Sequence, residues 1–96
     1  MRVQIDNNRV HVHDYVENVN DSDEIIRNVK GLLNSINNGI DLVFEDAFVI
    51  PSSLIGSLLE LRNSGDNRVV IHAKNHKLVT LFERLNLLDL LSVKKA

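Results

Sequence analysis

The fold of this chain is decided by one stretch of its sequence, IDLVFEDAFVIPSSLIGSLLELRNSG, residues 40–65. Its first five residues, 40–44, are apolar with little alternation, which is typical of a central strand covered on both faces. A short acidic loop follows, and a Ser-Ser pair then introduces an amphipathic stretch that is followed by Gly65. The stretch therefore predicts a strand, a loop, and a helix that begins near Ser52 and ends at about Asn63.

The preceding residues predict a hairpin and another helix. Residues 3–12 alternate apolar with polar side chains around an Asn-Asn pair, as in a two-stranded hairpin with one solvent-exposed face. Asp21 or Ser22 is expected to cap the helix, because Asp21 has capping-box spacing to Glu24 and apolar residues then recur at helical spacing. The Asn38-Gly39 pair is expected to end it.

The residues after the central stretch again predict a strand that is followed by a helix. Residues 68–73, RVVIHA, predict a second buried strand, and Asn75 is expected to cap the helix that follows. The tail, residues 86–96, predicts a short strand or a last helical turn. Strands that alternate with helices are typical of an α/β fold with right-handed crossovers. We therefore expect one α/β domain over residues 1–96, with a mixed four- to five-stranded sheet that opens with a hairpin and helices mainly on one face.

Composition narrows the class of function. A chain of 96 residues fits one domain, and 44% apolar residues is ordinary for a globular protein. The absence of cysteine excludes disulfides and thiolate chemistry and fits a cytoplasmic protein. A net charge of −2 argues against nucleic acid as a partner, and no apolar run is long enough for membrane insertion. The N-terminus does not resemble a signal peptide. None of these features predicts an oligomeric state.

Two segments carry a resemblance to a known family. They are PSSLIGSLLEL at 51–61 and LVTLFERLNLLDLL at 78–91. Their order and spacing resemble the STAS domain of bacterial anti-sigma factor antagonists. In that family D-S-(S/T/G)-G-L-G-x-L-L opens a helix and L-x-x-x-G-L-x-x-L/F closes the domain. Ser52 falls on the family's phosphorylatable serine and Ser53 on the next position. The resemblance implies a STAS-like fold for the single domain.

The resemblance also implies a function. It predicts a non-catalytic regulatory protein that docks on a serine-kinase-type anti-sigma factor and is switched by phosphorylation of Ser52 or Ser53. ATP would bind to the partner, so no cofactor and no metal are expected in this chain, and it is not expected to be an enzyme. The expected partner-binding residues lie in the loop and helix start around Ser52: Phe48, Ile50, Pro51, Ser52, Ser53 and Leu54.

Three positions depart from the family pattern. Pro51 stands where the family has Asp, Leu54 where it has Gly, and Val43 where many members have an Asp at the end of the strand. In the family the two Asp residues at these positions shape the site where the partner kinase acts. The departures therefore bear on phosphorylation more than on the fold.

Four of the site residues have two interpretations each. Ser52 can be a helix N-cap whose hydroxyl accepts from a backbone N–H, or a switch on a docking surface. Leu54 can be a core residue or an exposed apolar contact, and the same two alternatives apply to Ile50 and Phe48.

Other classes of function stay open. One is a constitutive STAS assembly subunit of a transporter or another complex, which needs no switch. A less favoured one is a small receiver-like phosphoacceptor that uses Asp46, with Glu45 beside it and Lys74 after a later strand. His11 and His13 share a strand face but form only a weak metal-binding signal. No catalytic triad and no Gly-rich phosphate loop can be assigned from the spacing.

Overall fold

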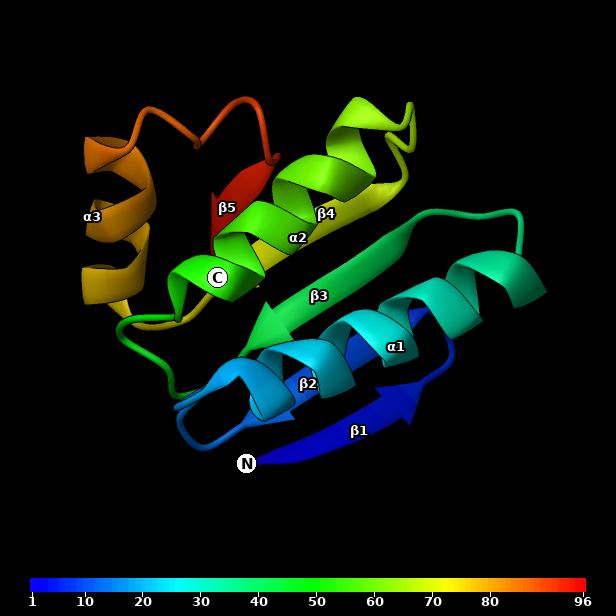
Figure 1. Cartoon of the computed structure of the whole chain (residues 1–96), viewed down its shortest axis with the longest axis horizontal. Helices are drawn as coiled ribbons and strands as arrows, with labels where there is room; N and C mark the ends of the chain where they lie inside the picture. Colours follow the sequence, from blue (N-terminus) through cyan, green and yellow to red (C-terminus); the bar gives the residue numbers. More distant parts are fainter.

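Five strands form one mixed sheet whose order in space follows the chain, β1-β2-β3-β4-β5 (Figure 1). The structure, a computed structural model, describes residues 1–96. Its elements are β1 (Arg2–Asp6), β2 (Arg9–His13), α1 (Val19–Ser35), β3 (Ile40–Phe44), α2 (Ser52–Asn63), β4 (Val69–Ala73), α3 (His76–Arg84) and β5 (Val93–Lys95). The predicted hairpin and the two predicted strands that follow it are therefore confirmed as strands, and of the two alternatives for the tail the structure shows the short strand.

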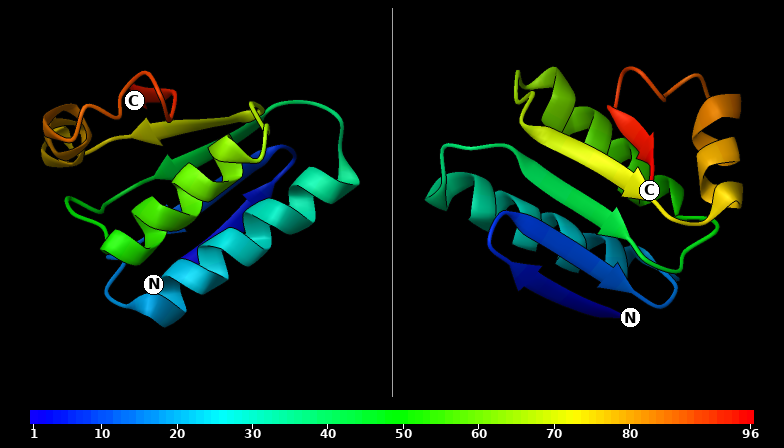
Figure 2. Two further views of the ribbon diagram at one scale, coloured as in Figure 1. Left: turned by 45° about the horizontal axis from the view of Figure 1, so that its top comes forward. Right: turned by 180° about the vertical axis from the view of Figure 1, so that it is seen from behind.

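The helices lie mainly on one face of the sheet. β1 pairs with β2 antiparallel, and every later pair is parallel. Each parallel crossover contains a helix, and all crossovers step across the sheet in the same direction, so right-handed connections bring the helices to the same side. Figure 2 shows α1 and α2 over one face, α3 beside the edge near β5, and the other face uncovered. None of the three helices is both long enough and apolar enough to span a membrane.

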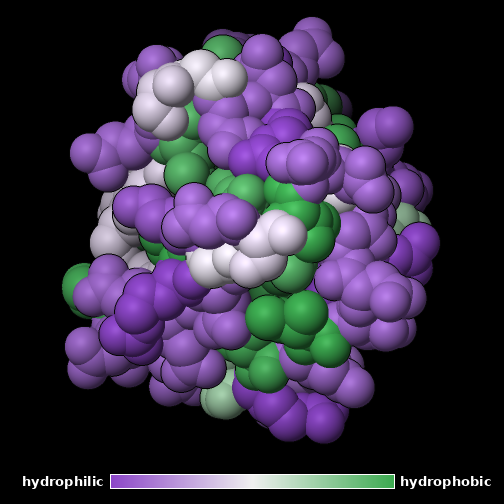
Figure 3. Space-filling view, turned by 90° about the vertical axis from the view of Figure 1, so that its right-hand side faces the viewer, coloured by the Kyte–Doolittle hydropathy of each residue, from purple (hydrophilic) through white to green (hydrophobic).

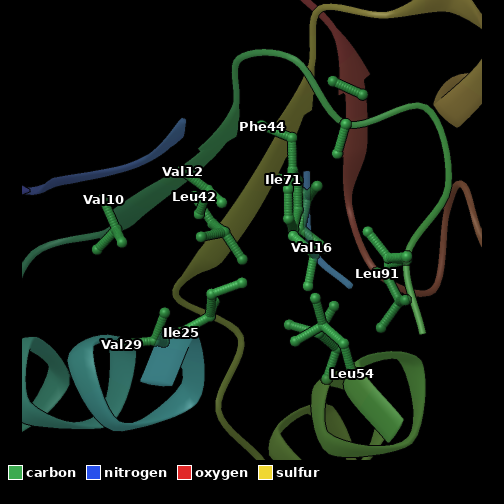
Figure 4. Packing of buried hydrophobic residues seen from close by; sticks show 14 of the residues in the cluster. Val10, Val12, Val16, Ile25, Val29, Leu42, Phe44, Leu54, Ile71 and Leu91 are labelled. Carbon is green, nitrogen blue, oxygen red and sulfur yellow. The ribbon is translucent and has the colours of Figure 1, made fainter. Parts of the chain in front are cut away.

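The core lies between the sheet and the helices. Figure 4 shows side chains of β2, β3 and β4 pointing toward Ile25 and Val29 of α1 and Leu54 of α2. Leu58 of α2 and Phe82 of α3 are 3% and 0% exposed, as their helical spacing predicts. The strand residues in this layer are Val10, Val12, Leu42, Phe44 and Ile71.

The expectation that β3 is covered on both faces is wrong. Ile40, Leu42 and Phe44 face the helices and are fully buried, whereas Asp41 and Val43 lie on the uncovered face. Val43 is nevertheless only 6% exposed, because a histidine side chain from each neighbouring strand lies beside it. His11 of β2 and His72 of β4 are its register partners. Because these histidines shield it, β3 can carry an apolar residue on its uncovered face. The sequence of β3 therefore looks like that of a strand covered on both faces.

The start of α1 also differs from the expectation. Asn18 caps the helix, and its side-chain oxygen accepts from the backbone N–H of Asp21 at 2.9 Å. The Asp21 carboxylate accepts in turn from the backbone N–H of Glu17 at 2.9 Å. The predicted pairing of Asp21 with Glu24 is therefore wrong, and the helix begins about one turn earlier. The helix also ends at Ser35, before the Asn-Gly pair.

Candidate functional site

The loop between β3 and α2 lies at the carboxyl end of the parallel strands, where α/β sheets place their sites. Its side chains divide into buried anchors and exposed ones. Ala47 and Ile50 are 0% and 5% exposed and hold the loop against the core. Phe48 and Val49, between these anchors, are 42% and 51% exposed. The loop therefore presents an aromatic and a β-branched side chain to solvent on a fixed backbone.

Aromatic and cationic side chains surround Phe48. The Tyr15 ring meets the Phe48 ring edge to face, with centroids 5.4 Å apart and an angle of 84° between the ring planes. The Lys77 ammonium lies 5.9 Å from the Phe48 ring centroid. A shallow depression beside the loop is lined by Phe48, Val49, Lys77, Thr80, Leu81 and Arg84. We call Tyr15, Phe48, Val49, Lys77 and Arg84 the Phe48 surface.

Ser52 is the first residue of α2 and is exposed. The N-cap is Pro51, whose backbone is extended and whose side chain makes no capping hydrogen bond. The Pro51 carbonyl accepts from the backbone N–H groups of Leu54 and Ile55 at 3.0 and 3.3 Å. The interpretation of Ser52 as the N-cap is therefore wrong by one residue, because the chain turns into the helix at proline. The Ser52 hydroxyl is consequently available to solvent or to a partner.

The neighbouring serine has a different environment. The Ser53 hydroxyl donates to the Ser22 hydroxyl oxygen at 3.0 Å, and Ser22 is only 1% exposed. Ser22 donates onward to the Asn18 carbonyl oxygen at 3.3 Å. Ser53 thus joins the start of α2 to the first turn of α1, so its hydroxyl is engaged inside the fold.

Two of the expected docking residues are not on the surface. Leu54 is fully buried and points from α2 into the core (Figure 4). Ile50 is 5% exposed and anchors the loop. For both residues the core interpretation is correct, because both belong to the buried apolar cluster between the sheet and the helices. Of the other expected docking residues, Phe48 and Ser52 are exposed, and Pro51 and Ser53 are half-buried.

The acidic residues of the loop are held by hydrogen bonds. Glu45 accepts from His11 Nδ1 at 2.9 Å and forms an ion pair with Lys74, so it links β2, β3 and β4. The ion pair with Lys74 lowers the pKa of Glu45 below its ordinary value of 4.5, and the His11 contact adds to this against the opposing effect of partial burial. Asp46 accepts from the backbone N–H of Asp14 at 2.7 Å. No three side chains of His, Cys, Asp or Glu lie close enough to hold a metal ion.

The lowered pKa of Glu45 predicts a pH-dependent contribution to stability. That contribution is present above pH 4.5, the ordinary value, and is lost as the pH falls through the lowered folded-state pKa. Glu45→Gln should therefore unfold at a lower temperature than wild type at pH 7, and the difference should shrink in acid. Glu60→Gln, at an exposed position of α2, is the control and should match wild type at both pH values. Thermal melts at pH 7 and below pH 4 make the comparison; an equal gap at both would contradict it.

The opposite end of the molecule has a different character. Figure 3 shows it as mostly hydrophilic, with a narrow apolar strip between charged and polar side chains. Apolar atoms therefore reach the surface at both ends. What distinguishes the loop end is an aromatic pair beside an exposed serine.

Comparisons with protein-family models, with curated proteins and with solved structures find no match to this chain.

The sequence interpretation missed four members of this surface: Tyr15, Val49, Lys77 and Arg84. They come from three separate segments, and the pattern of no single segment places them together. One signal was present, because Tyr15 is the only tyrosine and stands in a polar segment where it has no core role.

Proposed function

We propose that this protein is a cytoplasmic, non-catalytic regulatory binding protein that resembles an anti-sigma factor antagonist. It docks on a serine-kinase-type anti-sigma factor through the Phe48 surface and the start of α2. The observation that carries the proposal is the position of Ser52, exposed and without a capping role, in the same loop–helix junction as the exposed Phe48. The sequence resemblance adds support, since it places the phosphorylatable serine of the family at this same position.

The chemistry of the Phe48 surface supports docking on a protein. Tyr15 and Phe48 are 54% and 42% exposed, and large aromatic side chains that become buried in an interface contribute much of its binding energy. Lys77 and Arg84 line the same depression and are not ion-paired within the chain. Cations beside an aromatic centre favour a partner that presents apolar side chains with carboxylates around them.

A phosphate on Ser52 would weaken binding to the partner and would not destabilise the fold. The first N–H groups of α2 have no acceptor within the helix, and the helix dipole favours an anion at this end. The phosphate would add about −1.5 to −2 charges to the docking surface. Since the phosphoryl group would come from the partner kinase, ATP would bind there, and this chain would only present the hydroxyl.

Ser52→Asp tests the switch. We expect the melting temperature to stay near that of wild type, because an aspartate in the first turn of a helix is favourable. Binding to the partner captured from the native cell should weaken about tenfold or more, which corresponds to about 1.4 kcal/mol. Ser52→Ala is the matched control and should keep both stability and binding, since its hydroxyl caps nothing. Calorimetry with the purified partner measures the affinities.

The same experiment separates the switch from a constitutive assembly subunit. Pro51 stands where the family has Asp, and this favours a subunit that is never phosphorylated. In that case Phe48→Ala would weaken binding while Ser52→Asp would not, and protein isolated from cells would contain no phosphoserine. That pair of results would replace the switch with constitutive assembly on a transporter or another complex.

A further inference from the structure

β1 is an edge strand with one side unpaired. The Val12 carbonyl oxygen accepts from the Glu45 backbone N–H at 3.0 Å, so the peptide groups of Val12 point toward β3. Val3 lies opposite Val12, and the two therefore form a non-hydrogen-bonded pair of the antiparallel ladder. The N–H and C=O groups of Val3 must then point away from the sheet. The strand alternates, so those of Ile5 point outward as well.

This edge has few of the features that usually prevent strands from pairing between chains. Natural edge strands are often protected by proline, by charged side chains, above all lysine, or by a bulge. β1 contains no proline or lysine, its two charged side chains are of opposite sign, and its five residues stay in unbroken register with β2. Ile5 lies opposite Val10, which is fully buried under the helices, so Ile5 is on that same face of the sheet and is 47% exposed there. Figure 1 shows β1 at the edge of the sheet, where a second strand could lie beside it.

The sequence of β1, RVQID, is complementary to itself in the antiparallel direction. Arg2 and Asp6 stand at its two ends, and neither is ion-paired within the chain. An antiparallel copy centred on Gln4 would place each Arg2 opposite an Asp6 and each Val3 opposite an Ile5. Val3 and Ile5 are the residues with outward peptide groups, so each such pair would exchange both of its N–H···O bonds.

We propose that two copies of this chain join through β1, antiparallel about a two-fold axis at Gln4, to form one continuous sheet. A two-fold arrangement uses the same patch on both copies and leaves no open edge at the junction. The charges fix the register: a slip by two residues would place Arg2 or Asp6 opposite Gln4, and a slip by one would place the apolar side chains on the wrong face. This inference does not rest on the proposed function.

Charge-swap variants of the full chain test the proposal by sedimentation velocity over a range of concentrations. The wild type should show a reversible dimer. Arg2→Asp and Asp6→Arg should each raise the dimer dissociation constant at least tenfold, because each creates two like-charged pairs across the axis. The double variant, which restores opposite charges in the same register, should recover the dimer.

Ile5→Pro provides a second test that is independent of charge. The Ile5 N–H points outward, so proline at this edge position removes a donor to the second copy without removing a ladder bond inside the chain. We expect a monomer whose circular dichroism spectrum matches that of wild type. The proposal would be overturned by a wild type that stays monomeric at millimolar concentration, by a dimer that survives both single charge variants, or by a double variant that fails to restore it.

Discussion

Phe82→Ala is expected to lower the free energy of unfolding by about 3–5 kcal/mol. The Phe82 side chain is fully buried and belongs to the same apolar cluster as the sheet and the other two helices. α3 has only nine residues, so an isolated helix of this length would not be stable and its packing must hold it in place. Removal of the ring leaves a cavity that the flanking strands of a small sheet fill only in part.

Leu85→Ala is the matched control, because Leu85 follows the same helix and is 46% exposed. It should cost at most about 1 kcal/mol, as most exposed substitutions do. Urea denaturation monitored by circular dichroism measures both variants. A domain of this size has about 5–15 kcal/mol of stability, so the Phe82 variant would lose a large share of it. If the two variants unfold at the same urea concentration, the packing of α3 described above is wrong.

Arg68→Met is expected to lower the free energy of unfolding by about 1.5–3 kcal/mol, the range for hydrogen bonds to charged groups. The Arg68 guanidinium donates to the carbonyl oxygens of Ile36 at 2.7 Å and Leu33 at 3.1 Å. It thereby satisfies the carboxyl-terminal end of α1 from a position directly before β4. It also pairs with Asp66 at 3.4 Å. Methionine keeps much of the apolar stem and removes these donors.

The pKa of Asp66 gives this variant a second readout. Partial burial alone would raise the pKa of Asp66, but hydrogen bonds from the Arg68 backbone N–H and side chain outweigh it and hold the pKa below its ordinary value of 3.8. In Arg68→Met the pKa should rise, which NMR titration of the carboxyl carbon can follow. The stability that this pair contributes is present above pH 3.8 and is lost as the pH falls through the lowered folded-state value, so the cost should be smaller in strong acid.

Arg27→Met in α1 serves as the control, since Arg27 is exposed in the middle of its helix and is not ion-paired. It should leave both the stability and the Asp66 titration nearly unchanged. An Arg68 variant that is as stable as the Arg27 variant would contradict the role of Arg68 at the end of α1.

Local signals in the sequence were enough for most of the framework. The apolar run that forms β3, the Asn-Asn turn of the hairpin and the Asn75 cap of α3 all depend on residues within a few positions of one another. The Asn75 side chain accepts from the Lys77 backbone N–H at 2.9 Å, as the cap prediction requires. Alternation of strands and helices then leaves few ways to arrange a sheet, since the crossovers are right-handed.

Tertiary structure decided the features that depend on distant residues. Whether Leu54 is core or surface depends on where β3 and β4 lie above α2, and the apolar character of leucine is equally compatible with both. Val43 is buried between His11 and His72 only because three strands share one register.

The candidate site also combines one feature that local sequence predicts with contacts that depend on the fold. Local sequence was enough to place a serine at the start of α2, because a Ser-Ser pair precedes an amphipathic stretch. Only the tertiary structure brought Tyr15 and Lys77 to Phe48, from segments about 30 residues away on either side. Hydrophobic periodicity reports which face of an element is buried, but it has no information on which exposed side chains of different elements meet.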